Sequence, residues 1–123
     1  MKHSATLLLS AAIGLLCMAF TAGGCTSGVS SGEPISSAQA HALVENGAWL
    51  VDVRSDGEWE EGHLRGAVHI PVDALSARMA ELPHEHPVVV YCASGRRSAE
   101  AARVLRAAGY DAQDLGGMAR WVE

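Results

Sequence analysis

Apolar and polar positions vary along the chain in a way that predicts strands and helices in alternation. Short, mainly apolar runs predict strands at 49–53, 67–70, 88–91 and 112–115. The segments between these runs predict helices that begin near Ser36, Asp56, Asp73 and Ser98. Such alternation predicts an α/β domain in which a small parallel sheet is covered by helices on both faces.

Local signals mark the beginnings of two of these helices. Ser36 and Gln39 form a capping-box pattern at the first helix. Asp73 is predicted to cap a later helix, whose apolar residues Leu75, Met79 and Leu82 share one face. Both helices are therefore expected to pack an apolar side against the sheet.

A cysteine stands where the third predicted strand gives way to the last helix. Cys92 opens the loop 92–98, so we expect it at the carboxyl end of a central strand, where open α/β sheets bind ligands. The helix N-terminus and the guanidiniums of Arg96 and Arg97 favour a thiolate there. Gly95 permits the positive φ that a curled loop needs. The alternative is an inert cysteine buried in the core.

The Cys92 loop and several further segments resemble the rhodanese-like single-domain sulfurtransferases. The loop matches that family's pattern C-x-x-G-x-R through Cys92, Gly95 and Arg97. The other similar segments, in chain order, are 51–54, 58–67 with 70–71, 109–110 and 115–121. Because these motifs are spaced in the family's order, the resemblance covers residues 35–123, and it implies the rhodanese-like fold.

The resemblance also implies an activity. Cys92 would take a sulfur atom from an anionic donor such as thiosulfate, hold it as a persulfide, and pass it to cyanide or a thiol. The residues implied to bind the substrate are Ala93, Ser94, Gly95, Arg96, Arg97 and Ser98. No cofactor and no metal is expected. The alternative is that the chain is not an enzyme but a non-catalytic rhodanese-like module that binds a partner protein at the cell envelope.

The spacing of the loop argues against phosphate-ester hydrolysis. Related folds with that activity resemble this one but carry C-x5-R, a loop one residue longer that fits a larger tetrahedral anion. In this chain the corresponding position is Ser98. The shorter loop suits a sulfur atom or a small sulfur oxyanion.

The first residues resemble an export signal. A weakly basic start is followed by an apolar run over 5–20 and by small residues, the layout of a secretory signal peptide over 1–24. The stretch Ala-Gly-Gly-Cys at 22–25 resembles a bacterial lipobox, with Ala22 where Leu is usual, so Cys25 is expected to be lipidated. Ordinary secretion is the alternative. Residues 25–34 are predicted to be a flexible tether to a domain over 35–123.

Composition limits the partners of that domain. About ninety residues can bury one core. The net charge of the chain is −5 and its only lysine is Lys2, so the domain is not expected to have a basic surface that binds nucleic acid.

The cysteines also limit the possible disulfides. With Cys17 in the signal segment and Cys25 at the lipid site, Cys92 is the remaining thiol, and no internal disulfide is expected in the mature monomer. Unacylated Cys25 could instead pair with Cys92 and mask the site.

Other candidate residues have simpler structural explanations. Asp52 and Arg54 are expected to tie neighbouring loops together, although Arg54 could line the pocket. The histidines at 63, 69, 84 and 86 lack the spacing of a closed metal site. His63 is expected to be a hydrogen-bonded structural residue.

Overall fold

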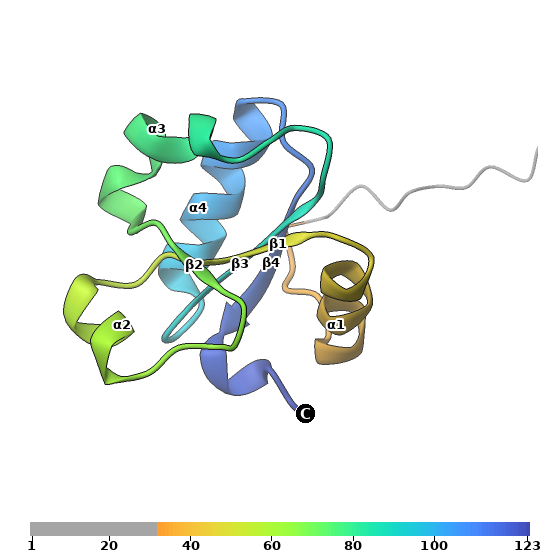
Figure 1. Ribbon diagram of the computed structural model, residues 1–123, viewed down its shortest axis with the longest axis vertical. Helices are drawn as coiled ribbons and strands as arrows, with labels where there is room; N and C mark the ends of the chain where they lie inside the picture. The colour runs from red at the N-terminus through yellow and green to blue at the C-terminus, as the bar shows by residue number, and fades with distance from the viewer. Residues whose placement is uncertain (1–31) are drawn as a thin grey trace, which may run out of the picture.

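The computed structural model describes residues 32–123, and these residues contain a four-stranded, fully parallel sheet (Figure 1). In spatial order the strands are β2 (Val68–His69), β1 (Trp49–Asp52), β3 (Val88–Cys92) and β4 (Ala112–Gly117). The central strand β3 is buried at every position, as its continuous apolar run predicts. The predicted parallel sheet is confirmed.

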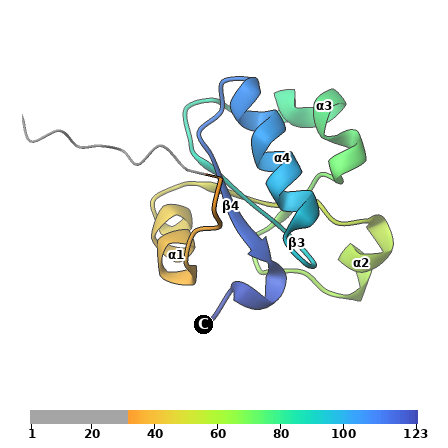
Figure 2. The same cartoon turned by 180° about the vertical axis from the view of Figure 1, so that it is seen from behind.

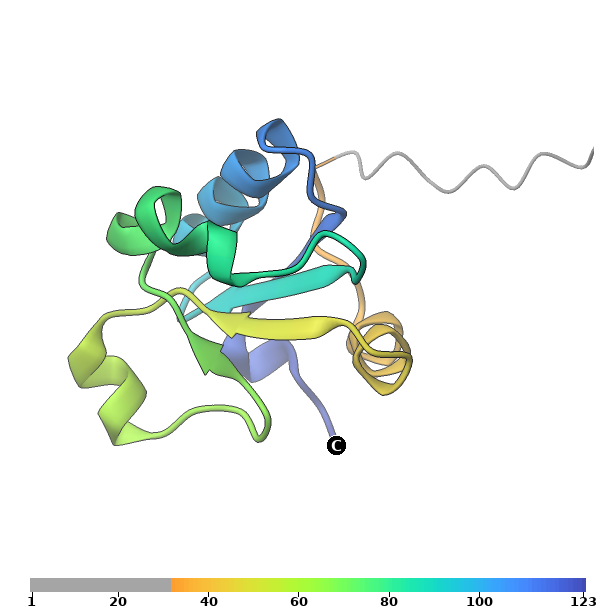
Figure 3. The same ribbon diagram turned by 45° about the horizontal axis from the view of Figure 1, so that its top comes forward.

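Helices cover both faces of the sheet, as predicted (Figure 3). On one face lie α3 (Leu75–Arg78) and α4 (Arg96–Ala107), and on the other lies α1 (Ser37–Glu45). The short helix α2 (Asp56–Glu61) stands beyond the end of β1. Short 3-10 turns occupy Val72–Ala74, Met79–Glu81 and Met118–Arg120.

The side chains of β3 alternate between two hydrophobic clusters, one on each face of the sheet. Val88, Val90 and Cys92 pack with residues of α4, whereas Val89 and Tyr91 pack with residues of α1. This two-residue period is a property of any strand. It places Cys92 on the α4 side of the sheet.

The predicted capping box of the first helix is present. Ser36 Oγ accepts a hydrogen bond from the Gln39 amide at 3.1 Å, and Gln39 Oε1 accepts one from the Ser36 amide at 2.8 Å. The last helix begins at Arg96, two residues earlier than predicted. Within residues 32–123 no helix is long and apolar enough to span a membrane.

The prediction of one helix capped by Asp73 is wrong. The segment is a 3-10 turn, a single short α-helix at Leu75–Arg78 and a second 3-10 turn, and the Asp73 side chain makes no capping bond. The hydroxyl of Tyr110 donates to the carbonyl oxygens of Met79 and Leu82, at 2.7 and 2.8 Å. Pro83 has no amide hydrogen with which to continue a helix past this point, and the Tyr110 hydroxyl instead satisfies carbonyl groups at the end of the segment.

The predicted signal segment 1–24, Cys25 and the tether up to residue 31 lie outside the described residues. The described chain joins the sheet at Ile35, whose amide donates to the carbonyl oxygen of Asp114 at 2.7 Å.

Replacing Tyr110 with Phe tests the contact that holds the end of the 72–82 segment. Because Tyr110 is 6% exposed and its hydroxyl serves two carbonyl groups, Tyr110→Phe should lower the free energy of unfolding by about 1–3 kcal/mol. Urea denaturation of the two proteins measures the difference. Equal midpoints and slopes would contradict this account of the segment.

Candidate active site

Cys92 is the last residue of β3, and the chain turns from it directly into α4 (Figure 2). The turn is completed by Gly95, the residue before α4, with φ of 101°. That left-handed conformation costs a residue with a Cβ atom far more than it costs glycine. Gly95 thus allows a strand and a helix to be joined by only three residues, Ala93, Ser94 and Gly95.

The tight turn points hydrogen-bond donors at the sulfur. The Gly95 amide donates to Cys92 Sγ at 2.9 Å, and Ser98 Oγ lies 3.5 Å from the same sulfur. Ser98 Oγ also lies 3.0 Å from the Gly95 carbonyl oxygen and 3.4 Å from that of Gly116. The hydroxyl can therefore accept from the thiol while donating to a carbonyl, or turn its hydrogen to a thiolate.

These donors set the direction in which the pKa of the Cys92 thiol is shifted. Burial by itself raises the pKa of the thiol, since the side chain is fully buried (0% exposed). The Ser98 hydroxyl and the amides of Ser98, Gly95 and Ser94 outweigh burial and bring the pKa below its ordinary value. The same burial means that a reactant reaches the sulfur only when neighbouring groups move.

The end of β4 lies closely against the Cys92 loop. A bulge at Leu115 shifts the pairing of β3 with β4, so that Cys92 is opposite Gly117. A Cβ atom at Gly117 would lie 2.7 Å from the Ala93 carbonyl oxygen, which is too close for any real side chain. Sequence reasoning missed this requirement, although the paired glycines at 116–117 were its signal.

The two arginines of the loop have different surroundings. Arg97 donates to both carboxylate oxygens of Glu58 in α2, at 2.6 and 3.0 Å. Arg96 is exposed and, within residues 32–123, forms no ion pair. Sequence reasoning assigned both arginines to the donor and did not identify Glu58.

Glu58 is itself held in place. It is the third residue of α2, and its side chain completes a capping box with Ser55, the residue before the helix. The hydrogen bond from Arg97, partly opposed by desolvation and assisted by Ser55, lowers the pKa of Glu58 to about 2. The carboxylate is therefore ionised throughout the neutral range. The Ser-x-x-Glu pattern was the available signal.

A groove lies along the start of α4, with a volume of about 630 Å³. Its lining residues are Val72, Asp73, Arg96, Arg97, Ala99, Glu100 and Arg103. These residues come from the first turns of α4 and from the 3-10 turn after β2.

The predicted tie between Asp52 and Arg54 is present. Arg54 donates to both oxygens of the buried Asp52 carboxylate, at 3.0 Å from Nε and 2.7 Å from Nη2, and to the Gly62 carbonyl oxygen at 2.6 Å. These bonds join the end of β1 to the end of α2. The guanidinium of Arg54 is thus occupied by hydrogen bonds to Asp52 and Gly62.

The histidines have structural contacts of their own. His63 stacks on Trp59 with ring centres 3.5 Å apart, and its Nδ1 lies 3.1 Å from the Trp59 carbonyl oxygen. His69 stacks on the same indole at 4.9 Å. In the part of the chain that the structure describes, no three His, Cys, Asp or Glu side chains are grouped so as to hold a metal ion.

The chain belongs to the rhodanese-like domain family, whose model matches residues 36–123. It is 40% identical over 78 residues to the uncharacterized protein YqhL of Bacillus subtilis, a match covering 60% of each chain. It is 39% identical over 61 residues to a sulfurtransferase of Allochromatium vinosum, covering 50% of this chain and 57% of that one. The chain thus spans less than two thirds of these relatives.

Solved structures agree with this family. A rhodanese-like domain protein from Staphylococcus aureus matches with a TM-score of 0.65 and 29% identity, over 74% of this chain and 92% of that one. The human single-domain sulfurtransferase TSTD1 matches with a TM-score of 0.62 and 30% identity, over 72% of this chain and 93% of that one. The expected rhodanese fold is confirmed, and the relatives support sulfur transfer as the general activity.

Ser98→Ala tests whether the hydroxyl lowers the pKa of Cys92. The variant loses a donor to the thiolate, so the pH profile of Cys92 alkylation should move to higher pH. Ser94→Ala is the matched control, because it removes an exposed hydroxyl of the same loop and keeps the amide. Peptide mass spectrometry follows alkylation at Cys92 alone. A profile unchanged in Ser98→Ala, or shifted equally in both variants, would contradict the assignment.

Proposed function

We propose that this domain transfers sulfane sulfur from a small anionic donor such as thiosulfate to cyanide or a thiol, through a persulfide on Cys92. The observation that carries the proposal is the convergence of the Ser98 hydroxyl and loop amides on a sulfur whose pKa they lower. A thiolate is the form of cysteine that attacks sulfur. Membership of the family and the named sulfurtransferases among its relatives add support.

The proposed reaction has two displacements. The Cys92 thiolate attacks the outer sulfur of thiosulfate, a bond forms between the two sulfurs, and the donor's S–S bond breaks with its electron pair leaving on sulfite. The acceptor, cyanide or a thiolate, then attacks the outer persulfide sulfur. The product is thiocyanate or a new persulfide, and the thiolate of Cys92 is restored. No external oxidant or reductant is needed.

The loop supplies what both steps require. Negative charge moves from Cys92 Sγ to the departing sulfite and, in the second step, back to Sγ. Amides fixed around the sulfur stabilise this charge without rearranging, as donors in an oxyanion hole do. The absence of a side chain at Gly117 leaves room for the Ala93 carbonyl group, and so for the loop shape that directs those amides inward.

The proposal extends to the location of the protein. We propose that residues 1–24 direct export and that Cys25 is acylated at the bacterial cell envelope. The apolar run followed by Ala-Gly-Gly-Cys supports this. The chain 26–34 would then tether the domain to the membrane surface.

Intact mass after incubation with thiosulfate tests the enzymatic role. Wild-type protein should gain one sulfur atom on Cys92 and lose it to cyanide, whereas Cys92→Ser should gain none and retain less than about a tenth of the transfer activity. Circular dichroism checks that the variant is folded. Wild-type protein that gains no sulfur would instead favour a non-catalytic binding module.

Processing at Cys25 has a separate test. Wild-type protein should incorporate labelled fatty acid and resist salt washing, because each buried CH₂ contributes about 0.8 kcal/mol and several chains are attached. Cys25→Ala should block incorporation. A wild-type protein found soluble in the periplasm or medium with an unmodified N-terminus would refute lipidation and favour ordinary secretion.

A further inference from the structure

Two arginines near the Cys92 loop, Arg97 and Arg54, form ion pairs. Arg97 is paired with Glu58, and Arg54 is paired with Asp52. Each guanidinium meets its carboxylate through two or more hydrogen bonds, a geometry that fixes position as well as charge. Among the cations at the start of α4, this leaves Arg96 with no carboxylate partner in residues 32–123.

The Glu58 to Arg97 pair is built from two rigid elements. Glu58 is fixed by its capping box with Ser55, with 3.0 Å between Ser55 Oγ and Glu58 Oε1. Arg97 is in the first turn of α4, next to the loop that surrounds the sulfur. Figure 2 shows α2 beside the start of α4. Two of the five N–H groups of Arg97 are directed at Glu58, and turning the guanidinium toward a donor would break both bonds.

Within residues 32–123, the groove along the start of α4 also contains both paired and unpaired arginines. Of its three arginines, Arg97 is paired with Glu58 and Arg103 with Glu100. The third, Arg96, is exposed. Within the groove, Arg96 is therefore the arginine whose charge is not already paired with a carboxylate of the described residues. The exposed Asp73 also lines the groove and forms no ion pair within residues 32–123.

We propose that Glu58 is a positioning residue that withholds Arg97 from the donor, so that Arg96 is the cation that binds the donor's anionic end. This inference deepens the proposed function and rests on it for the identity of the donor. Arg97 then serves to join α2 to the start of α4. The specificity for anions rests on one arginine rather than two.

The variant Glu58→Gln separates charge from structure. Glutamine at the same helix position completes the capping box of α1, where Gln39 accepts from the Ser36 amide at 2.8 Å. Glu58→Gln should therefore keep the start of α2 and remove only the negative charge. The set to compare is Arg96→Gln, Arg97→Gln, Glu58→Gln and the double variant Glu58→Gln/Arg97→Gln.

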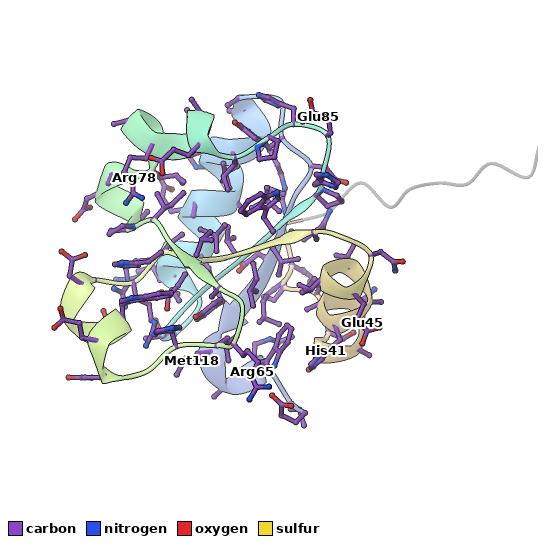
Figure 4. All side chains as sticks on the ribbon, in the orientation of Figure 1. His41, Glu45, Arg65, Arg78, Glu85 and Met118 are labelled. Carbon is purple, nitrogen blue, oxygen red and sulfur yellow. The ribbon has the colours of Figure 1, made fainter. Side chains whose placement is uncertain are left out.

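The probes are iodoacetate, which is an anion, and iodoacetamide, which is neutral. The ratio of their rates at Cys92, followed by peptide mass spectrometry on the full chain, reports the attraction of an anion to the sulfur. This ratio does not depend on sulfur transfer. Arg78→Gln is the control, because Arg78 of α3 (labelled in Figure 4) donates two hydrogen bonds to Glu81 in the following 3-10 turn, and neither residue belongs to the loop or lines the groove.

The expected ratios distinguish the two roles of Arg97. Arg96→Gln should lower the ratio by about fivefold or more, and Arg97→Gln should also lower it, because Glu58 is left unpaired. Glu58→Gln should raise it. The ratio for the double variant should lie within about twofold of the wild-type ratio, because two neutral side chains replace an ion pair whose charges cancel. The control should not change.

Steady-state kinetics with thiosulfate give a second measurement. The KM for thiosulfate should change in the opposite direction to the alkylation ratio, and Arg96→Gln should raise KM while leaving kcat within about threefold. A double variant as poor as Arg97→Gln, in ratio and in KM, would overturn the inference and make Arg97 a donor ligand. If wild type transfers no sulfur but the alkylation ratios hold, the proposed function fails and the anion-binding role of Arg96 stands.

Discussion

The hydrogen bond from the Gly95 amide to Cys92 Sγ is the contact on which the site depends. It requires the chain to curl back within three residues of the strand end, and Gly95 permits this with a φ of 101°. The same curl brings Ser98 to the sulfur one helical turn later. Without this curl, the loop donors would not reach the sulfur, and burial would favour the neutral thiol, which is a poor nucleophile.

The sheet supplies the rigid support for that curl. Because β3 is buried on both sides and paired with β1 and β4, its carboxyl end has little freedom to move. The bulge at Leu115 brings Gly117 opposite Cys92, and the missing side chain leaves room for the Ala93 carbonyl group. A backbone constraint on one strand thus shapes the loop that follows another.

The features that follow local rules were predictable from the sequence, and those that depend on distant residues were not. The strands, the Ser36 capping box and the position of Cys92 each follow from a few adjacent residues. The Glu58 to Arg97 pair joins residues 39 positions apart, and no local pattern indicates it. The hydrogen bond from the Tyr110 hydroxyl to the Met79 carbonyl at the end of the 72–81 segment likewise joins residues 31 positions apart.

The loop donors lower the pKa of Cys92 despite the burial of its side chain, and the proposed reaction depends on this shift. The most direct measurement is the difference in ultraviolet absorbance between wild type and Cys92→Ser as pH is varied, since a thiolate absorbs where a thiol does not. We expect a titration midpoint below that of an ordinary thiol, which is about 8.5. A midpoint at or above that value would show that burial prevails over the loop donors, and would contradict the account.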